Sequence, residues 1–93
     1  IINQNIKFLE RESFENMKNL RFLDLSNNLI EFLNDDVFND LSNLNDLNLH
    51  KNLIKTLPVE IFKNLEKIQT IKLSENRIET LPRDLFNENF HQR

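Results

Sequence analysis

Glycine and cysteine are both missing from this chain of 93 residues. Without cysteine, neither a disulfide nor a thiolate metal site can form, and two histidines are too few for a structural zinc site. The absence of cysteine leaves the compartment open, because a cysteine-free segment can belong to a secreted protein with disulfides elsewhere. Without glycine, turns with a left-handed backbone must rely on asparagine, which tolerates that conformation better than most residues.

The sequence also lacks a charge cluster of one sign and a long apolar run. Its formal net charge is -3, and the basic residues are interspersed among the acidic ones, which makes nucleic acid a poor candidate partner. No apolar run approaches the roughly 20 residues that span a bilayer, so we expect no direct membrane insertion by this segment. The chain starts Ile-Ile-Asn, without an initiator Met or a signal peptide, so we expect an excerpt from a longer protein.

A period of 24 residues is the main positive feature of the sequence. Eight positions recur in three successive units, and of these 24 positions only Asn89 departs from the pattern. Chance does not produce such regularity, so the chain is predicted to be a stack of repeats. The recurrent positions are Leu20, Leu44 and Ile68; Leu23, Leu47 and Ile71; Leu25, Leu49 and Leu73; Asn28, Asn52 and Asn76; Ile30, Ile54 and Ile78; Leu33, Leu57 and Leu81; Phe38, Phe62 and Phe86; and Leu41, Leu65 and Asn89.

The period also sets the expected organisation of the chain, which at this length is a single domain. The pattern slips or ends near Asn89, because Phe90 comes one residue after the expected leucine position. The predicted parts of this one segment are a partial repeat over residues 1–19, full repeats over residues 20–43, 44–67 and 68–91, and a tail at residues 92–93.

Each repeat reads LxxLxLxxNxI, from Leu20 to Ile30 and again from Leu44 and from Ile68. By this motif the chain resembles the leucine-rich-repeat family over essentially its whole length. The resemblance implies an α/β fold, namely a right-handed, curved solenoid. Its concave face would carry a parallel β-sheet, and its convex face short helical or irregular segments. The resemblance also implies a binding protein, and we predict that the chain is not an enzyme.

The longer form of the repeat adds a late phenylalanine and the dipeptides Leu57-Pro58 and Leu81-Pro82. In this form it is similar to the repeats of extracellular members such as Toll-like receptors and Slit-like proteins. That resemblance implies a receptor ectodomain or a secreted recognition protein, extracellular or at the cell surface, with a role in innate immunity or cell adhesion. A cytoplasmic scaffold is the alternative, and shorter repeats with leucine in place of the late phenylalanine would favour it.

Apolar and polar residues alternate around Leu23 and Leu25, which predicts a strand with one buried face in each repeat. Stacked repeats would place these strands side by side, about 4.8 Å apart, so that equivalent exposed residues form lateral rows. We interpret this concave face as the site where a protein or peptide ligand binds. The candidate ligand-binding residues are Arg21, Phe22, Asp24, Asp46, Asn48, His50, Lys51, Thr70 and Lys72.

Several exposed residues allow more than one interpretation. Phe22 is either an aromatic anchor of the binding face or a residue that packs against a preceding repeat, with equal weight. Lys51 and Glu75 fall in one row and can pair laterally. The segment Asn34-Asp35-Asp36 with Asn39-Asp40 offers oxygen ligands, but it lacks the spacing and the glycine of a calcium loop. We therefore predict no metal site there, and no cofactor elsewhere.

One lateral row contains Ser26, His50 and Ser74, with Asp24 and Asp46 nearby, which suggests a serine–histidine–aspartate arrangement. Nothing in the sequence supplies an oxyanion hole or a glycine-containing nucleophile turn, and an open sheet does not exclude water. We therefore predict no catalytic residues. A solvated polar row is the simpler interpretation, with His50 available as a contact for a ligand.

Two recurrent positions are predicted to have structural roles. Asn28, Asn52 and Asn76 lie where the chain leaves the strand, and each amide can bond both N–H and C=O groups there. The late phenylalanines are expected to stack as a convex-side spine at about 5–6 Å. They are Phe14, Phe38, Phe62 and Phe86.

A structural function competes with ligand binding. Repeats of this kind can act as spacers that extend an array and position other repeats without touching a ligand. No cysteine-rich cap covers either end of the sequence, so apolar residues would be unprotected there. We therefore also expect end-to-end or homotypic association of the isolated segment.

Overall fold

The computed structural model describes residues 5–83 and Leu85. Its elements, in chain order, are the 3-10 helix η1 (Arg11–Phe14) and the strands β1 (Phe22–Asp24), β2 (Asp46–Asn48) and β3 (Thr70–Lys72). In this part of the chain η1 is the only helix, and turns and irregular segments make the other connections. The predicted boundary near Asn89 lies outside the described residues.

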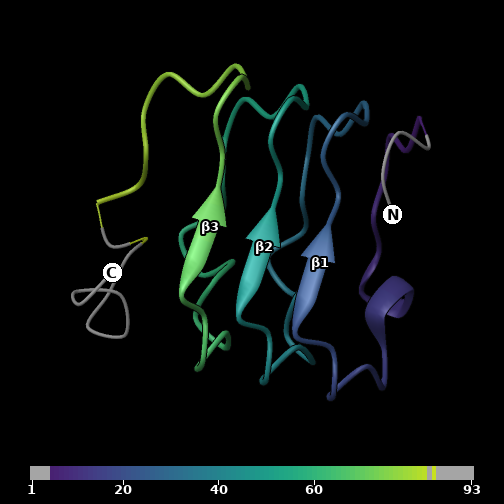
Figure 1. Cartoon of the computed structure of the whole chain (residues 1–93). Coiled ribbons are helices and arrows are strands. Elements are labelled where there is room, and N and C mark those ends of the chain that lie inside the picture. Colours follow the sequence, from purple (N-terminus) through teal and green to yellow (C-terminus); the bar gives the residue numbers. More distant parts are fainter. Residues whose placement is uncertain (1–4, 84, 86–93) are drawn as a thin grey trace.

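The three strands form one parallel sheet in the order β1-β2-β3 (Figure 1). The register pairs Leu23 with Leu47 and Leu47 with Ile71, so each step across the sheet is one 24-residue repeat. The sequence period and the strand register are therefore the same, which confirms the predicted parallel sheet. Equivalent residues of successive repeats lie next to one another, as the lateral rows require.

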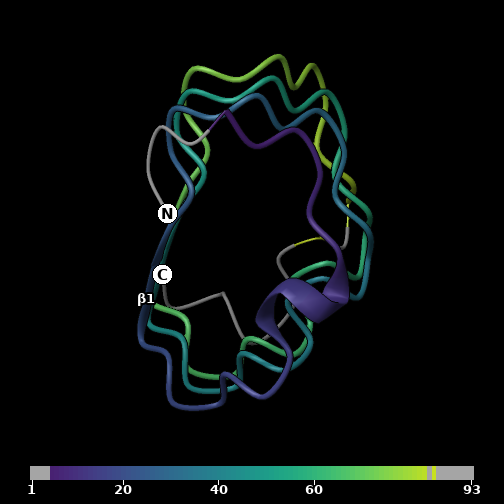
Figure 2. The same ribbon diagram turned by 90° about the vertical axis from the view of Figure 1, so that its right-hand side faces the viewer.

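The repeats lie in line with one another when the molecule is viewed along the stack (Figure 2). The strands run along one side of the stacked turns, and η1 lies on the opposite side. Between the two sides is the core, where the recurrent residues Leu25, Leu49, Ile30 and Ile54 are fully buried. The recurrent apolar positions thus form one continuous core, whose burial is the main favourable contribution to folding.

The recurrent asparagines join neighbouring repeats, as Asn52 illustrates. Its Nδ2 donates to the carbonyls of Leu49, in its own repeat, at 3.0 Å and of Leu25, in the preceding repeat, at 2.9 Å. Its Oδ1 accepts the N–H of Ile30, also in the preceding repeat, at 3.2 Å. This confirms the predicted structural role. Asn28 and Asn76 make equivalent bonds. Asn28 donates to Leu25 O and accepts the N–H of Ile6. Asn76 donates to Leu49 O and accepts the N–H of Ile54.

The late phenylalanines form the predicted spine on the side opposite the strands. The ring centroids of Phe14 and Phe38 are 6.1 Å apart, and those of Phe38 and Phe62 are 6.4 Å apart. These distances are slightly longer than expected. All three rings are buried, so their first role is to fill the core. Phe86, the fourth expected member, lies outside the described residues.

Three equivalent residues that follow the strands have a left-handed backbone, with φ of 58° at Asn27, 58° at Lys51 and 56° at Glu75. The expectation that asparagine serves such turns is therefore wrong at Lys51 and Glu75. At Lys51 a hydrogen bond between repeats explains the difference. The N–H of Asn27 donates to His50 O at 2.9 Å, and that of Lys51 donates to Ser74 O at 3.0 Å. At Lys51 this bond fixes the turn and offsets the cost of about 1–2 kcal/mol of a left-handed lysine.

We predict that Asn52→Ala lowers the free energy of unfolding by about 1–3 kcal/mol. The N–H of Ile30 would lose its acceptor, and the carbonyls of Leu25 and Leu49 would each lose one of two asparagine donors. Urea unfolding followed by circular dichroism measures the change.

The control is Asn34→Ala, because Asn34 is exposed and its side chain makes no hydrogen bond within residues 5–83. Its unfolding midpoint should stay close to that of the original chain. An unchanged midpoint for Asn52→Ala would contradict the structural role of the asparagines.

Candidate functional site

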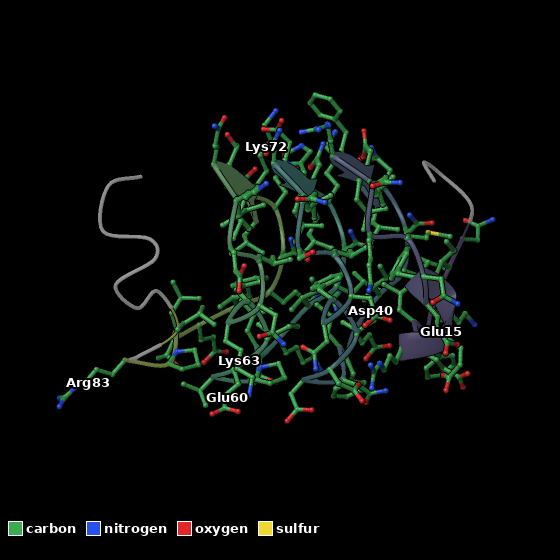
Figure 3. The ribbon with its side chains drawn as sticks, turned by 90° about the horizontal axis from the view of Figure 1, so that it is seen from below. Glu15, Asp40, Glu60, Lys63, Lys72 and Arg83 are labelled. Carbon is green, nitrogen blue, oxygen red and sulfur yellow. The ribbon has the colours of Figure 1, made fainter. Side chains whose placement is uncertain are left out.

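A hollow of about 320 Å³ opens on the outer side of the sheet, and all three strands contribute to it. Leu23 and Leu47 are buried, so they form its floor. Figure 3 places Lys72 on this side of the molecule, whereas Glu60 and Lys63 lie on the opposite side of the core. The outward-directed lining residues, which we call the strand face, are Phe22, Asp24, Asp46, Asn48, Thr70 and Lys72.

The strand face contains six of the nine residues that the sequence nominated for ligand binding. Arg21, His50 and Lys51 do not line the hollow. Arg21 precedes β1, where its carbonyl accepts the N–H groups of Asn45 at 2.8 Å and of Asp46 at 3.1 Å. His50 and Lys51 follow the end of β2. The structure thus separates the nine residues into a central group of six and three residues at its edges.

Phe22 is the most exposed large apolar residue of the strand face, with 68% of its surface accessible. It lies directly opposite Asp46 in the register of β1 and β2, and Asp46 in turn lies opposite Thr70. An exposed ring at the edge of a hollow resembles the aromatic anchors of protein interfaces.

Asp24 is held in place by its own turn. Its Oδ1 accepts the hydroxyl of Ser26 at 2.6 Å and the N–H of Ser26 at 2.9 Å. The hydroxyl bond is the main reason that the pKa of Asp24 falls below its ordinary value of 3.8, with burial acting in the opposite direction. The N–H of Ser26 and the positive charge of Lys72 lower the pKa further. Asp24 is therefore a fixed negative charge on the strand face at neutral pH.

His50 contacts the following repeat. Its Nδ1 lies 2.6 Å from Ser74 Oγ, and its Nε2 lies 3.6 Å from Glu75 Oε2. Glu75 is thus paired with His50 and not with Lys51, as the shared row had suggested. The lysine is exposed, and an exposed pair gains too little energy to order two long side chains.

The serine–histidine–aspartate arrangement is not formed. Asp24 bonds Ser26, which is the serine of its own repeat, instead of orienting the ring of His50. The serine next to His50 is Ser74, and both Ser74 and Glu75 are exposed to water. The polar row is therefore a set of local side-chain contacts along one edge of the strand face.

Two exposed aromatic residues were not singled out from the sequence. Phe8 and Phe32 occupy equivalent positions in the first two repeats, and 76% and 61% of their surfaces are accessible. The sequence shows the 24-residue spacing between them. It does not show their exposure, because their position lies outside the strand and outside the recurrent apolar pattern. Both residues lie away from the hollow lining.

No cluster of three or more potential metal-ligating side chains occurs among the described residues. Within the same residues, no helix has the length and apolar character needed to cross a membrane.

A family model described as "Leucine rich repeat" matches residues 1–54 and again residues 42–89. The two matches together extend over all three strands and the whole strand face. No curated protein matches the chain with significance.

We predict that Ser26→Ala raises the pKa of Asp24 toward 3.8, because the largest cause of its depression is removed. A carboxyl with a lowered folded pKa stabilises the protein above its unfolded pKa, and that contribution is lost as the pH falls through the folded value. As the pH is lowered below about 4, the free energy of unfolding of Ser26→Ala should therefore decrease less than that of the original chain. A carboxyl NMR titration of Asp24 measures the pKa itself.

Ser74→Ala is the matched control, since Ser74 holds the same position two repeats later and contacts His50. It should leave the Asp24 titration unchanged. A Ser26→Ala protein with the same Asp24 titration as the original chain would show that the hydroxyl bond does not set this pKa.

Proposed function

Because the chain belongs to the leucine-rich-repeat family, whose domains generally bind proteins, we propose that it is an interaction module that binds a protein or peptide on its strand face. Members of the family are typically not catalytic. In the polar row, Asp24 bonds Ser26 and not His50. The hollow lined by Phe22 and five polar or charged side chains is the observation that carries the proposal.

The family implies a solenoid, and we propose that it is right-handed and curved, with the strand face on its concave side. Two spacings support the direction of curvature. Parallel strands lie about 4.8 Å apart. The rings of Phe14, Phe38 and Phe62 on the opposite side are 6.1 and 6.4 Å apart. A stack that is wider on one side bends toward the other, which here is the side of the strands.

We further propose that the parent protein is a receptor ectodomain or a secreted recognition protein, located outside the cell or at its surface. The buried phenylalanine spine supports this proposal only through its similarity to extracellular repeats. An intracellular scaffold is the alternative. A role in innate immunity or cell adhesion is part of the same proposal.

A spacer function is the second candidate, and one observation favours it. On the last described repeat, Ile71, Leu73 and Ile78 are only partly buried, whereas their equivalents in the preceding repeat are buried. Apolar side chains at such an open edge favour the stacking of another repeat, or of a second copy of the chain. As a spacer, the chain would contact neighbouring repeats through its ends and would not bind a ligand on its strand face.

We predict that peptides selected from a random displayed library on the immobilised chain lose at least about tenfold in affinity in Phe22→Ala and Lys72→Ala. His50→Ala, at the edge of the strand face, should have a smaller effect. Isothermal titration of the selected peptides against each purified variant measures the affinities.

The matched controls are Phe32→Ala, which removes a similarly exposed aromatic outside the hollow, and Lys63→Ala, on the opposite side of the core (Figure 3). Both should bind the selected peptides as the original chain does. The proposal would be refuted if only the control variants lost affinity for the peptides, or if no selected peptide depended on the strand face. Either result would favour the spacer function.

A further inference from the structure

An aromatic ring and two carboxylates meet in the hollow. The ring of Phe22 lies next to Asp46 across β1 and β2, and Asp24 follows two residues after Phe22 on the same side of the strand. An exposed aromatic ring and two carboxylates therefore border one space of about 320 Å³. The faces of aromatic rings and carboxylates both attract cations.

The two carboxylates differ in what they already bind. Asp46 is half-buried, and its carboxylate has no hydrogen bond or ion pair to any residue in the range 5–83. Asp24 uses Oδ1 for both bonds from Ser26, which leaves Oδ2 without a bond among these residues. The depressed pKa of Asp24 means that this second oxygen carries charge at neutral pH. A carboxylate oxygen that has no donor within the protein favours a ligand that supplies one.

The positive charge of the strand face lies at its other end. Lys72 is on β3, two strands away from Asp24 along the row Asp24, Asn48 and Lys72. Two strand spacings are about 10 Å, so the ammonium group does not neutralise the β1 end of the hollow by direct contact. The strand face is thus acidic and aromatic at β1 and β2, and basic at β3.

We propose that the β1–β2 end of the hollow is a subsite for one arginine or lysine side chain of the bound protein. The cation lies between the carboxylates of Asp24 and Asp46, and the apolar stem packs against the ring of Phe22. Arginine suits the subsite better than lysine, because its planar group stacks on a ring and bonds a carboxylate through two donors. This subsite rests on the proposed function, and it gives that function a partner chemistry.

The same charge pattern sets the orientation of the partner. A partner whose basic side chain occupies the β1–β2 end would place an acidic side chain near Lys72, about 10 Å away. The reverse orientation brings like charges together at both ends, which disfavours it. The strand face therefore selects a segment with basic and acidic groups in one order across the strands.

The test uses the 93-residue chain and two small probes, N-acetyl-arginine methylamide and its neutral isostere N-acetyl-citrulline methylamide. We expect the arginine probe to cause saturable NMR shifts at Phe22 and Asp46, and the citrulline probe to bind at least about threefold more weakly. Asp46→Asn and Phe22→Ala should each weaken the arginine probe by about threefold to tenfold. Lys72→Ala should bind it as well as or better than the original chain, because a repelling charge is removed.

Two variants control for nonspecific effects. Asp35→Asn removes the same charge at an exposed site outside the hollow, and Phe32→Ala removes an exposed ring there. Both should retain binding of the arginine probe. The subsite is overturned if citrulline binds as well as arginine, if Asp35→Asn weakens binding as much as Asp46→Asn, or if no saturable shift appears at Phe22 and Asp46.

The outcomes separate this inference from the function it rests on. If selected peptides require Phe22 and Lys72 but the arginine probe fails, the subsite is wrong and the strand face remains the binding surface. If the probe binds as expected but no selected peptide depends on the strand face, the cation site exists without the proposed interaction function, and the assignment to a partner's side chain is overturned.

Discussion

The hydrogen bonds of the recurrent asparagines are the constraint on which the rest of the structure depends. Each repeat leaves its strand at a point where backbone groups lose their partners in the sheet, and a buried polar group without a partner is costly. Asn52 supplies bonds to its own repeat and to the one before it. One side chain therefore closes a turn and also fixes the position of the neighbouring repeat, so that the turn and the stacking depend on the same hydrogen bonds.

This coupling determines what the outer side of the sheet can present. With the register fixed at one repeat per strand, Phe22, Asp46 and Thr70 lie in one row, and Asp24, Asn48 and Lys72 lie in the next. The recurrent leucines between these rows are buried, so the outward residues are free to differ from one repeat to another. The strand face combines a rigid spacing with side chains that the core does not constrain, and such a surface suits specific binding.

The sequence allowed prediction of the features that recur as the same residue type in each repeat, and not of those that depend on contacts with neighbouring residues. The parallel register, the asparagine bonds and the phenylalanine spine all follow from the 24-residue period, because burial and hydrogen bonding select the same residue types in each repeat. The left-handed backbone at Lys51 could not be predicted, because a bond to the following repeat overrides its local preference. The pairing of His50 with Glu75 was missed for a related reason, since the period does not set the rotamers of exposed side chains.

The candidate site shows the same division. Its six central residues were all nominated from their alternation with buried leucines, whereas the separation of His50 and Lys51 from the hollow depends on where β2 ends. Asp24 belongs both to the repeated turn and to the strand face. Its bonds to Ser26 belong to the turn that ends the strand, and they also hold a charged oxygen beside Phe22 and Asp46. A charge that is already oriented by the fold loses little freedom when a ligand binds, so under the proposed function the turn would contribute to the affinity of the strand face for its partner.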